Sequence, residues 1–153
     1  MTGETLRRGL IDTNVVVHLA ALDTADLPDE MVISAVTLGE LSASPHHTDD
    51  PAERPERMSV LQHAEATFEP LLFDTEAPRA FGLVTAAVLA TGRKPRRRIA
   101  ELMIASIAIA NQLPLSDAQG RHHPVPDGHD AADEPFVLSH QPVVLADGGG
   151  PPR

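Results

Sequence analysis

Short apolar runs alternate with longer segments of helical periodicity along most of the chain. The apolar runs have the length of strands, and they end at Ile11 and Ile33 and cover residues 70–73 and 113–115. The segments between them predict helices within residues 15–22, 34–43, 57–68, 74–92 and 98–110. This alternation is typical of an α/β fold, in which helices cover both faces of a parallel sheet.

The same pattern predicts which segments are buried and which are exposed. Residues 98–110 are apolar nearly all round, so we expect a central, buried helix there. Residues 44–56 are polar and hold three prolines, and we expect a loop. His18 and His63 are expected on the exposed surfaces of helices.

The pattern ends at Leu115. Residues 116–153 hold six of the 14 prolines and five of the 10 glycines, and only "PFVL" and "PVVL" have the character of strands. We therefore divide the chain into a domain of residues 1–115 and an atypical, irregular tail of residues 116–153. A shifted reading frame after about codon 115 would explain the change. A genuine extension that supplies an edge strand is the alternative.

Composition narrows the class of protein. The 153 residues suffice for one ordinary domain, and the absence of cysteine excludes disulfides and cysteine-based zinc or redox sites. No apolar run reaches the roughly 18 residues that span a bilayer. The opening "MTGETLRRGL" lacks the apolar core of a signal peptide. We expect a cytoplasmic protein without a membrane segment.

The charge is unevenly distributed. A net charge of −10 argues against a nucleic-acid ligand, because phosphate binding requires Lys and Arg. However, five of the 12 basic residues fall in "RKPRRR" at residues 93–98. This segment is either a positive edge that binds phosphates or a solvated loop.

Three acids interrupt apolar elements. Asp12 follows the first predicted strand, where it either helps to cap the next helix, together with Thr13 or Asn14, or lies at the ligand-binding end of the sheet. Glu40 and Glu101 lie in otherwise apolar helices. An isolated acid in a helix is usually a solvated edge residue or a partner of the helix dipole, and Glu101, near the start of its helix, fits the second description. A buried carboxylate needs a cation or a proton, and oxygen ligands of this kind suit Mg²⁺ or Mn²⁺. We predict that the three acids converge at the carboxyl ends of the strands.

The segments "LIDTNVVV", "ISAVTLGEL" and "IAELMIASIAIANQLPL" occur in this order within residues 7–115. Together they resemble the PIN-domain ribonucleases, in particular the VapC toxins of toxin–antitoxin pairs. The resemblance implies a PIN-like parallel sheet of four or five strands with helices on both faces. The first and second acids of the family correspond to Asp12 and Glu40. The third is normally Asp and corresponds to Glu101.

The resemblance implies a toxic, Mg²⁺-dependent endoribonuclease that hydrolyses RNA phosphodiester bonds. Asp12 and Glu101 would hold Mg²⁺ or Mn²⁺, and Glu40 would bind the metal directly or through water. The residues expected to contact the RNA backbone are Arg93, Lys94, Arg96, Arg97 and Arg98. The resemblance also implies a VapB-type antitoxin and a homodimer as partners.

The chain departs from the family beyond "LPL". The position of the fourth polar ligand corresponds by spacing to Gln119, and Asp117 is the nearest acid, so the fourth ligand is Asp117, Gln119 or absent. This departure and the Glu at position 101 favour an alternative, a PIN-fold protein that binds a partner without catalysis. A second alternative is a histidine metal site, built from His46, His47, His122, His123, His129 and His140.

Overall fold

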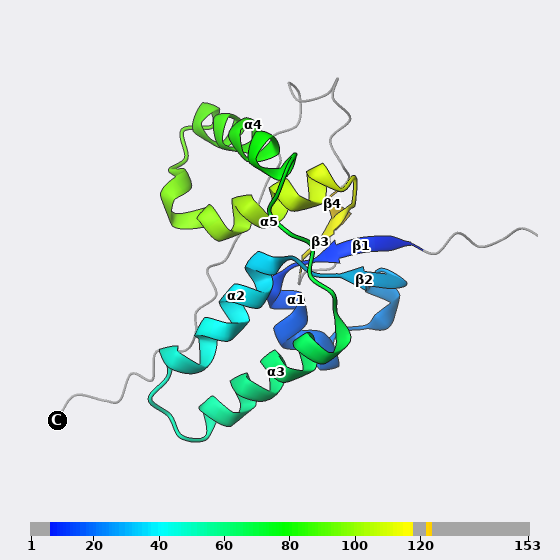
Figure 1. Ribbon diagram of the computed structural model, residues 1–153, viewed down its shortest axis with the longest axis vertical. Helices are drawn as coiled ribbons and strands as arrows, with labels where there is room; N and C mark the ends of the chain where they lie inside the picture. Colours follow the sequence, from blue (N-terminus) through cyan, green and yellow to red (C-terminus); the bar gives the residue numbers. More distant parts are fainter. Residues whose placement is uncertain (1–6, 118–121, 124–153) are drawn as a thin grey trace, which may run out of the picture.

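The structure is a computed structural model of the chain that describes residues 7–117 and 122–123 (Figure 1). Its sheet has the strand order β2-β1-β3-β4. The strands are β1 (Arg8–Ile11), β2 (Glu30–Val32), β3 (Leu115–Ser116) and β4 (His122–His123). β1 pairs in parallel with β2 and β3, and β4 pairs antiparallel with β3. The predicted α/β fold is confirmed. The described part has three parallel strands, fewer than the four or five that the resemblance implied, because residues 70–73 contribute only a single bridge.

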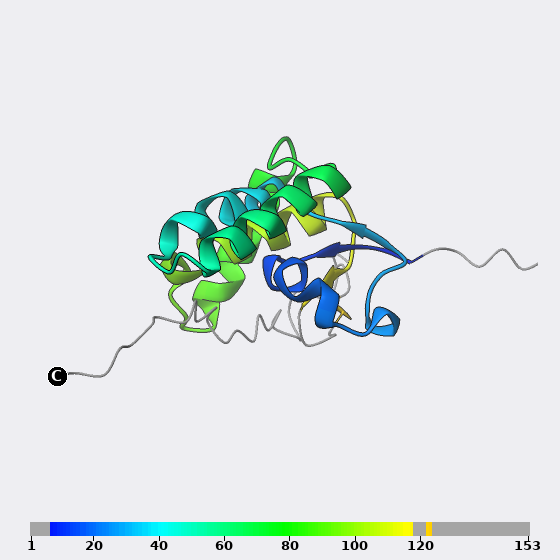
Figure 2. The same cartoon turned by 90° about the horizontal axis from the view of Figure 1, so that it is seen from below.

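Helices connect the strands and cover the sheet. The α-helices are α1 (Thr13–His18), α2 (Ala35–Ala43), α3 (Glu53–Thr67), α4 (Ala77–Ala90) and α5 (Ile99–Ala110). Short 3₁₀ helices are η1 (Leu19–Ala21), η2 (Thr24–Asp26), η3 (Ser44–His47) and η4 (Pro95–Arg98). α2 packs beside α3, and α4 packs beside α5 (Figures 1 and 2). No helix in the described ranges has the length and apolar character needed to cross a bilayer.

The central strand β1 separates two parts of the core. Ile11 packs in a cluster with Val15 of α1 and Ala64 of α3, whereas Leu10 packs in another with Ile104 of α5. Successive residues of a strand point to opposite faces, so helices cover both faces of the sheet. α5 contributes six buried residues, which confirms the prediction that it is central.

The predicted strand at residues 70–73 is reduced to one bridge. Leu71 pairs in parallel with Ser34, where the Ala35 N–H donates to the Leu71 carbonyl at 2.8 Å and the Leu71 N–H donates to the Ile33 carbonyl at 2.9 Å. Pro70 has no N–H to extend this ladder, and Leu72 is exposed. The sheet therefore gains a single residue beyond β2.

The loop predicted at residues 44–56 was wrong over part of its length. Residues Ser44–His47 form η3, and α3 begins at Glu53 rather than near Arg57. Pro55 is tolerated because it lies in the first turn of α3, where backbone N–H groups have no partner within the helix. Arg57 connects this turn to η3, because it forms an ion pair with Glu53 at 3.0 Å and donates a hydrogen bond to the Ser44 carbonyl.

The sheet continues past Leu115. Ser116 completes β3 and pairs with His122, so the expectation that only "PFVL" and "PVVL" form strands beyond Leu115 was wrong. The two-residue strand β4 has no alternation of apolar and polar residues by which a sequence pattern could reveal it. "PFVL" and "PVVL" lie outside the described residues. The division at residue 115 and its reading-frame explanation stay predictions.

Candidate functional site

Asp12 lies where β1 ends and α1 begins. Its carboxylate is the N-cap of α1, because Oδ1 accepts a hydrogen bond from the Val15 N–H at 2.9 Å. Its backbone N–H donates to the Ser116 carbonyl of β3 at 3.2 Å. Asp12 is thus both a helix cap and a residue at the carboxyl edge of the sheet.

Asp117 reaches the same edge from the neighbouring strand. Ile11 and Ser116 are partners in the parallel register of β1 and β3, so Asp12 and Asp117 leave their strands side by side. Asp117 is only 7% exposed. Burial raises the pKa of Asp12 to about 6, and the negative charges of Asp117 and Glu40 contribute to this rise.

Glu101 joins these acids from the first turn of α5, which contacts α2. Burial raises the pKa of Glu101 to about 7, and the negative charges of Glu40 and Asp12 add to the rise, while the positive charge of Arg98 opposes it. Asp12 and Glu101 therefore lie near enough to act on each other, both feel the charge of Glu40, and Asp12 also feels that of Asp117. The acids brought together in this way are Asp12, Glu40, Glu101 and Asp117.

Glu40 is held at this edge by α1. The Thr13 hydroxyl donates to Glu40 Oε1 at 2.6 Å and lies 3.2 Å from the hydroxyl of Thr37. Thr37 is fully buried, and its role escaped the sequence analysis. The available signal was spacing: Ser34, Thr37 and Glu40 recur every three residues and so share one side of α2.

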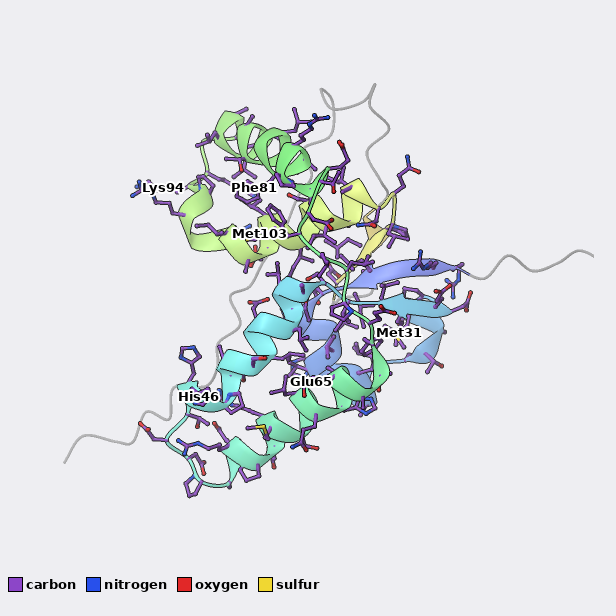
Figure 3. The ribbon with its side chains drawn as sticks, viewed as in Figure 1. Met31, His46, Glu65, Phe81, Lys94 and Met103 are labelled. Carbon is purple, nitrogen blue, oxygen red and sulfur yellow. The ribbon has the colours of Figure 1, made fainter. Side chains whose placement is uncertain are left out.

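The basic segment lies at the start of α5. Arg93, Lys94 and Arg96 are exposed, and Lys94 points away from the body of the molecule (Figure 3). Arg98 differs from them, because it is half-buried and its charge acts on Glu101. The side chain of Arg97 lies outside the described part.

The predicted histidine site lies largely outside the described residues. His46 and His47 are exposed on η3, and His46 lies beyond the end of α2 that is remote from the sheet (Figure 3). His129 and His140 are not described, and neither are the side chains of His122 and His123. His18 and His63 are exposed on helices, as predicted.

The donor set of the four acids fits a hard divalent cation. Carboxylate oxygens are the ligands that Mg²⁺ and Mn²⁺ prefer, and a cation among them would reverse the rise in the pKa values of Asp12 and Glu101. As the side chains stand, no three Asp, Glu or His residues of the described ranges are arranged to enclose one metal ion. The chemistry of the site therefore fits a cation, while the side chains would have to close around it.

Comparisons with known proteins identify relatives. Ribonuclease VapC5 of Mycobacterium tuberculosis is 31% identical over 110 residues, which cover 70% of this chain and 79% of the relative. Ribonuclease VapC4 of the same organism is 32% identical over 127 residues, which cover 80% and 94%. No family model matches the chain.

Solved structures agree with these relatives. VapBC-5, a toxin–antitoxin system from Mycobacterium tuberculosis, matches with a TM-score of 0.64 and 31% identity over 72% of this chain and 83% of that chain. VapBC2 from Rickettsia felis, bound to a promoter DNA fragment, has a TM-score of 0.57 and 20% identity over 71% and 85%. DNA-bound VapBC from Salmonella typhimurium has a TM-score of 0.55 and 22% identity over 76% and 89%. The last two show the fold alone.

Proposed function

The chain belongs to the VapC family of PIN-domain proteins, and from this premise we propose that it is a metal-dependent endoribonuclease, the toxin of a toxin–antitoxin pair. The observation that carries the proposal is the group of four acids at one edge of the sheet, two of which have strongly raised pKa values. Burial is the main cause of both rises, the neighbouring carboxylates add to it, and such perturbed acids are typical of sites that bind cations or protons.

In this proposal, Asp12 and Glu101 would hold Mg²⁺ or Mn²⁺, and Glu40 would bind it directly or through water. Asp117 is the fourth acid, because it is buried beside Asp12 in the register of β1 and β3. Gln119, the other candidate, lies outside the described residues. A bound cation lowers the pKa of a water ligand and neutralises charge on the scissile phosphate.

The other residues of the site orient the carboxylates or bind the RNA in this proposal. The Val15 N–H fixes one oxygen of Asp12, and the Thr13 hydroxyl fixes one oxygen of Glu40. Arg93, Lys94 and Arg96 are exposed and would contact RNA phosphates without reading sequence. Arg97 and Arg98 belong to the same proposed RNA-contact segment. Arg98 also acts on the acids, because its positive charge lowers the pKa of Glu101.

We propose a VapB-type antitoxin as the partner of this chain. The similar solved structures are VapBC systems, and the one that shares 31% identity is described as a member of a toxin–antitoxin family. We also propose that the chain forms a homodimer and that it cleaves RNA in the cytoplasm. A PIN-fold protein without catalysis stays the second candidate, because Glu101 replaces an Asp and the described acids do not enclose an ion.

The proposal is tested by incubating the full chain with total RNA, with Mg²⁺ or Mn²⁺ or with EDTA. We expect the wild-type chain to cleave RNA and EDTA to abolish this cleavage. Asp12→Asn removes the charge at nearly constant side-chain shape, and it should abolish cleavage as well. Asp49→Asn, at an exposed acid between η3 and α3, is the matched control and should cleave normally. Cleavage that survives both EDTA and Asp12→Asn would contradict the proposed site, whereas a wild-type chain that binds an antitoxin without cleaving RNA would support the second candidate.

A further inference from the structure

A line of three hydroxyl groups leads from the core to Glu40. The Ser34 hydroxyl lies 3.2 Å from that of Thr37, the Thr37 hydroxyl lies 3.2 Å from that of Thr13, and Thr13 Oγ1 lies 2.6 Å from Glu40 Oε1. Ser34 and Thr37 are fully buried, and Glu40 is exposed. The line therefore begins inside the protein and ends on a carboxylate of the candidate site.

The number of hydroxyl protons determines which group donates in each hydrogen bond of this line. Each hydroxyl has one proton to donate, and an ionised glutamate has none. The single proton of Thr13 is committed to Glu40 at the short distance expected for a charged acceptor. The proton between Thr13 and Thr37 must then come from Thr37, and the proton between Thr37 and Ser34 must come from Ser34.

Ser34 is suited to be the origin of the line. Its oxygen accepts the Thr37 backbone N–H at 3.0 Å, which caps α2 and leaves its own proton free to point toward Thr37 Oγ1. All three hydroxyls thus donate in one direction, toward Glu40. Hydrogen bonds that run in one direction polarise and strengthen one another.

We propose that Thr37 is a positioning residue of the candidate metal site: by donating to Thr13, its hydroxyl directs the only Thr13 proton toward Glu40. This inference rests on the proposed function. An exposed glutamate side chain has several rotamers, and holding one of them in advance lowers the entropy lost when a cation binds. Thr37 itself is buried and contacts neither metal nor RNA in this role.

The test measures Mn²⁺ binding by calorimetric titration into the full chain without RNA. Thr37→Val removes the hydroxyl at similar shape, and we expect Mn²⁺ affinity to fall about three- to tenfold, the effect of one lost hydrogen bond. Thr37→Ser keeps the hydroxyl and should restore affinity to within about twofold of wild type. Thr37→Ala serves the same purpose as valine if the valine variant does not fold.

Thr85→Val is the matched control. The Thr85 hydroxyl on α4 is also buried, and it has no hydrogen-bond partner within the described part of the chain. Its removal should leave Mn²⁺ affinity unchanged. Because Thr37→Val also removes the acceptor of Ser34, a loss of thermal stability alone does not distinguish positioning from a structural role.

A double-mutant cycle makes that distinction. The proposed line reaches Glu40 only through Thr13, so Thr37→Val should cause no further loss of affinity in a Thr13→Val background. Equal losses in both backgrounds, or an unchanged affinity of Thr37→Val, would overturn the inference while Mn²⁺ binding that Asp12→Asn removes still supports the proposed site. A wild-type chain that binds no Mn²⁺ would overturn both.

Discussion

Asp12 and Glu101 lie at the same edge of the sheet, but the protein accommodates their charges differently. Asp12 receives a backbone hydrogen bond from Val15, which lowers its pKa and partly offsets burial. For Glu101, the force that opposes burial is the charge of Arg98, a residue of the basic segment. Burial still prevails in both, and it raises the pKa of Asp12 to about 6 and that of Glu101 to about 7.

The comparison separates an acid held by the backbone from an acid held by a neighbouring charge. The capping hydrogen bond from the Val15 N–H ties one oxygen of the Asp12 side chain to the first turn of α1. A pair of charged side chains responds to salt, pH and an approaching phosphate. We therefore expect Asp12 to define the position of a cation, and Glu101 to respond to the state of the bound RNA.

The largest expected effect is on cleavage. Asp12→Asn and Glu101→Gln should each lower the rate by about a hundredfold or more, because each removes the charge of a proposed cation ligand, a change worth several kcal/mol. The measurement is the rate of RNA cleavage at saturating Mg²⁺. If only one of the two variants lost cleavage activity, the other acid would lie outside the active site, and the two could not be compared as parts of one site.

The next effect is on stability and its pH dependence. Both folded-state pKa values lie above the ordinary values of 3.8 and 4.5, so the folded protein binds these protons more tightly than the unfolded chain does. Stability from these acids is therefore greatest below the ordinary values and is lost as pH rises through about 6 and about 7.

In EDTA, each acid should lower the free energy of unfolding by about 1 to 2 kcal/mol between acidic and mildly alkaline pH, after allowance for solvent screening. Asp12→Asn should flatten the lower part of this pH profile, and Glu101→Gln the part that extends to higher pH. Urea unfolding across the pH range measures both. Profiles that do not differ from wild type would show that neither group is perturbed.

A smaller effect is expected from Arg98. Arg98→Gln removes the charge that opposes the rise in the Glu101 pKa, so that pKa should increase further. The pH at which Mg²⁺-dependent cleavage reaches half its maximum should then move up by about half a unit. Arg93→Gln, at an exposed position of the same segment, is the control. An equal shift in both variants would indicate a general effect of net charge.

The smallest effect is expected from Glu101→Asp, which restores the residue found in the resembled family. We expect cleavage to increase by about two- to fivefold, because Mg²⁺ requires near-ideal octahedral geometry and the shorter side chain matches the motif. The rate at saturating Mg²⁺ measures this. An unchanged or lower rate would show that the surrounding residues have adapted to the longer side chain.

The sequence predicted the parts of the fold that repeat a pattern. The strand–helix alternation, the buried α5 and the position of Asp12 after β1 all follow from periodicity over neighbouring residues. β4 and the early start of α3 did not follow. The two residues of β4 are too few to show a period, and prolines of a first helical turn look like those of a loop.

The site was predictable as residue types but not as contacts. Acids that interrupt apolar segments pointed to Asp12, Glu40 and Glu101. The place of Asp117 depends on the register between β1 and β3, which joins residues more than 100 positions apart. The contact of Thr37 with Thr13 depends on how α1 packs against α2. Neither is encoded in local spacing.

The shortness of the outer strands has a consequence for solubility. An exposed strand edge is a template on which a second chain can add, and long, flat edges promote aggregation. In the described part of this sheet, the position beyond β2 is taken by the single residue Leu71, and β3 is followed by the two-residue β4. The strands described therefore offer only short stretches of backbone for pairing, and we expect these edges to contribute little to fibre-like association.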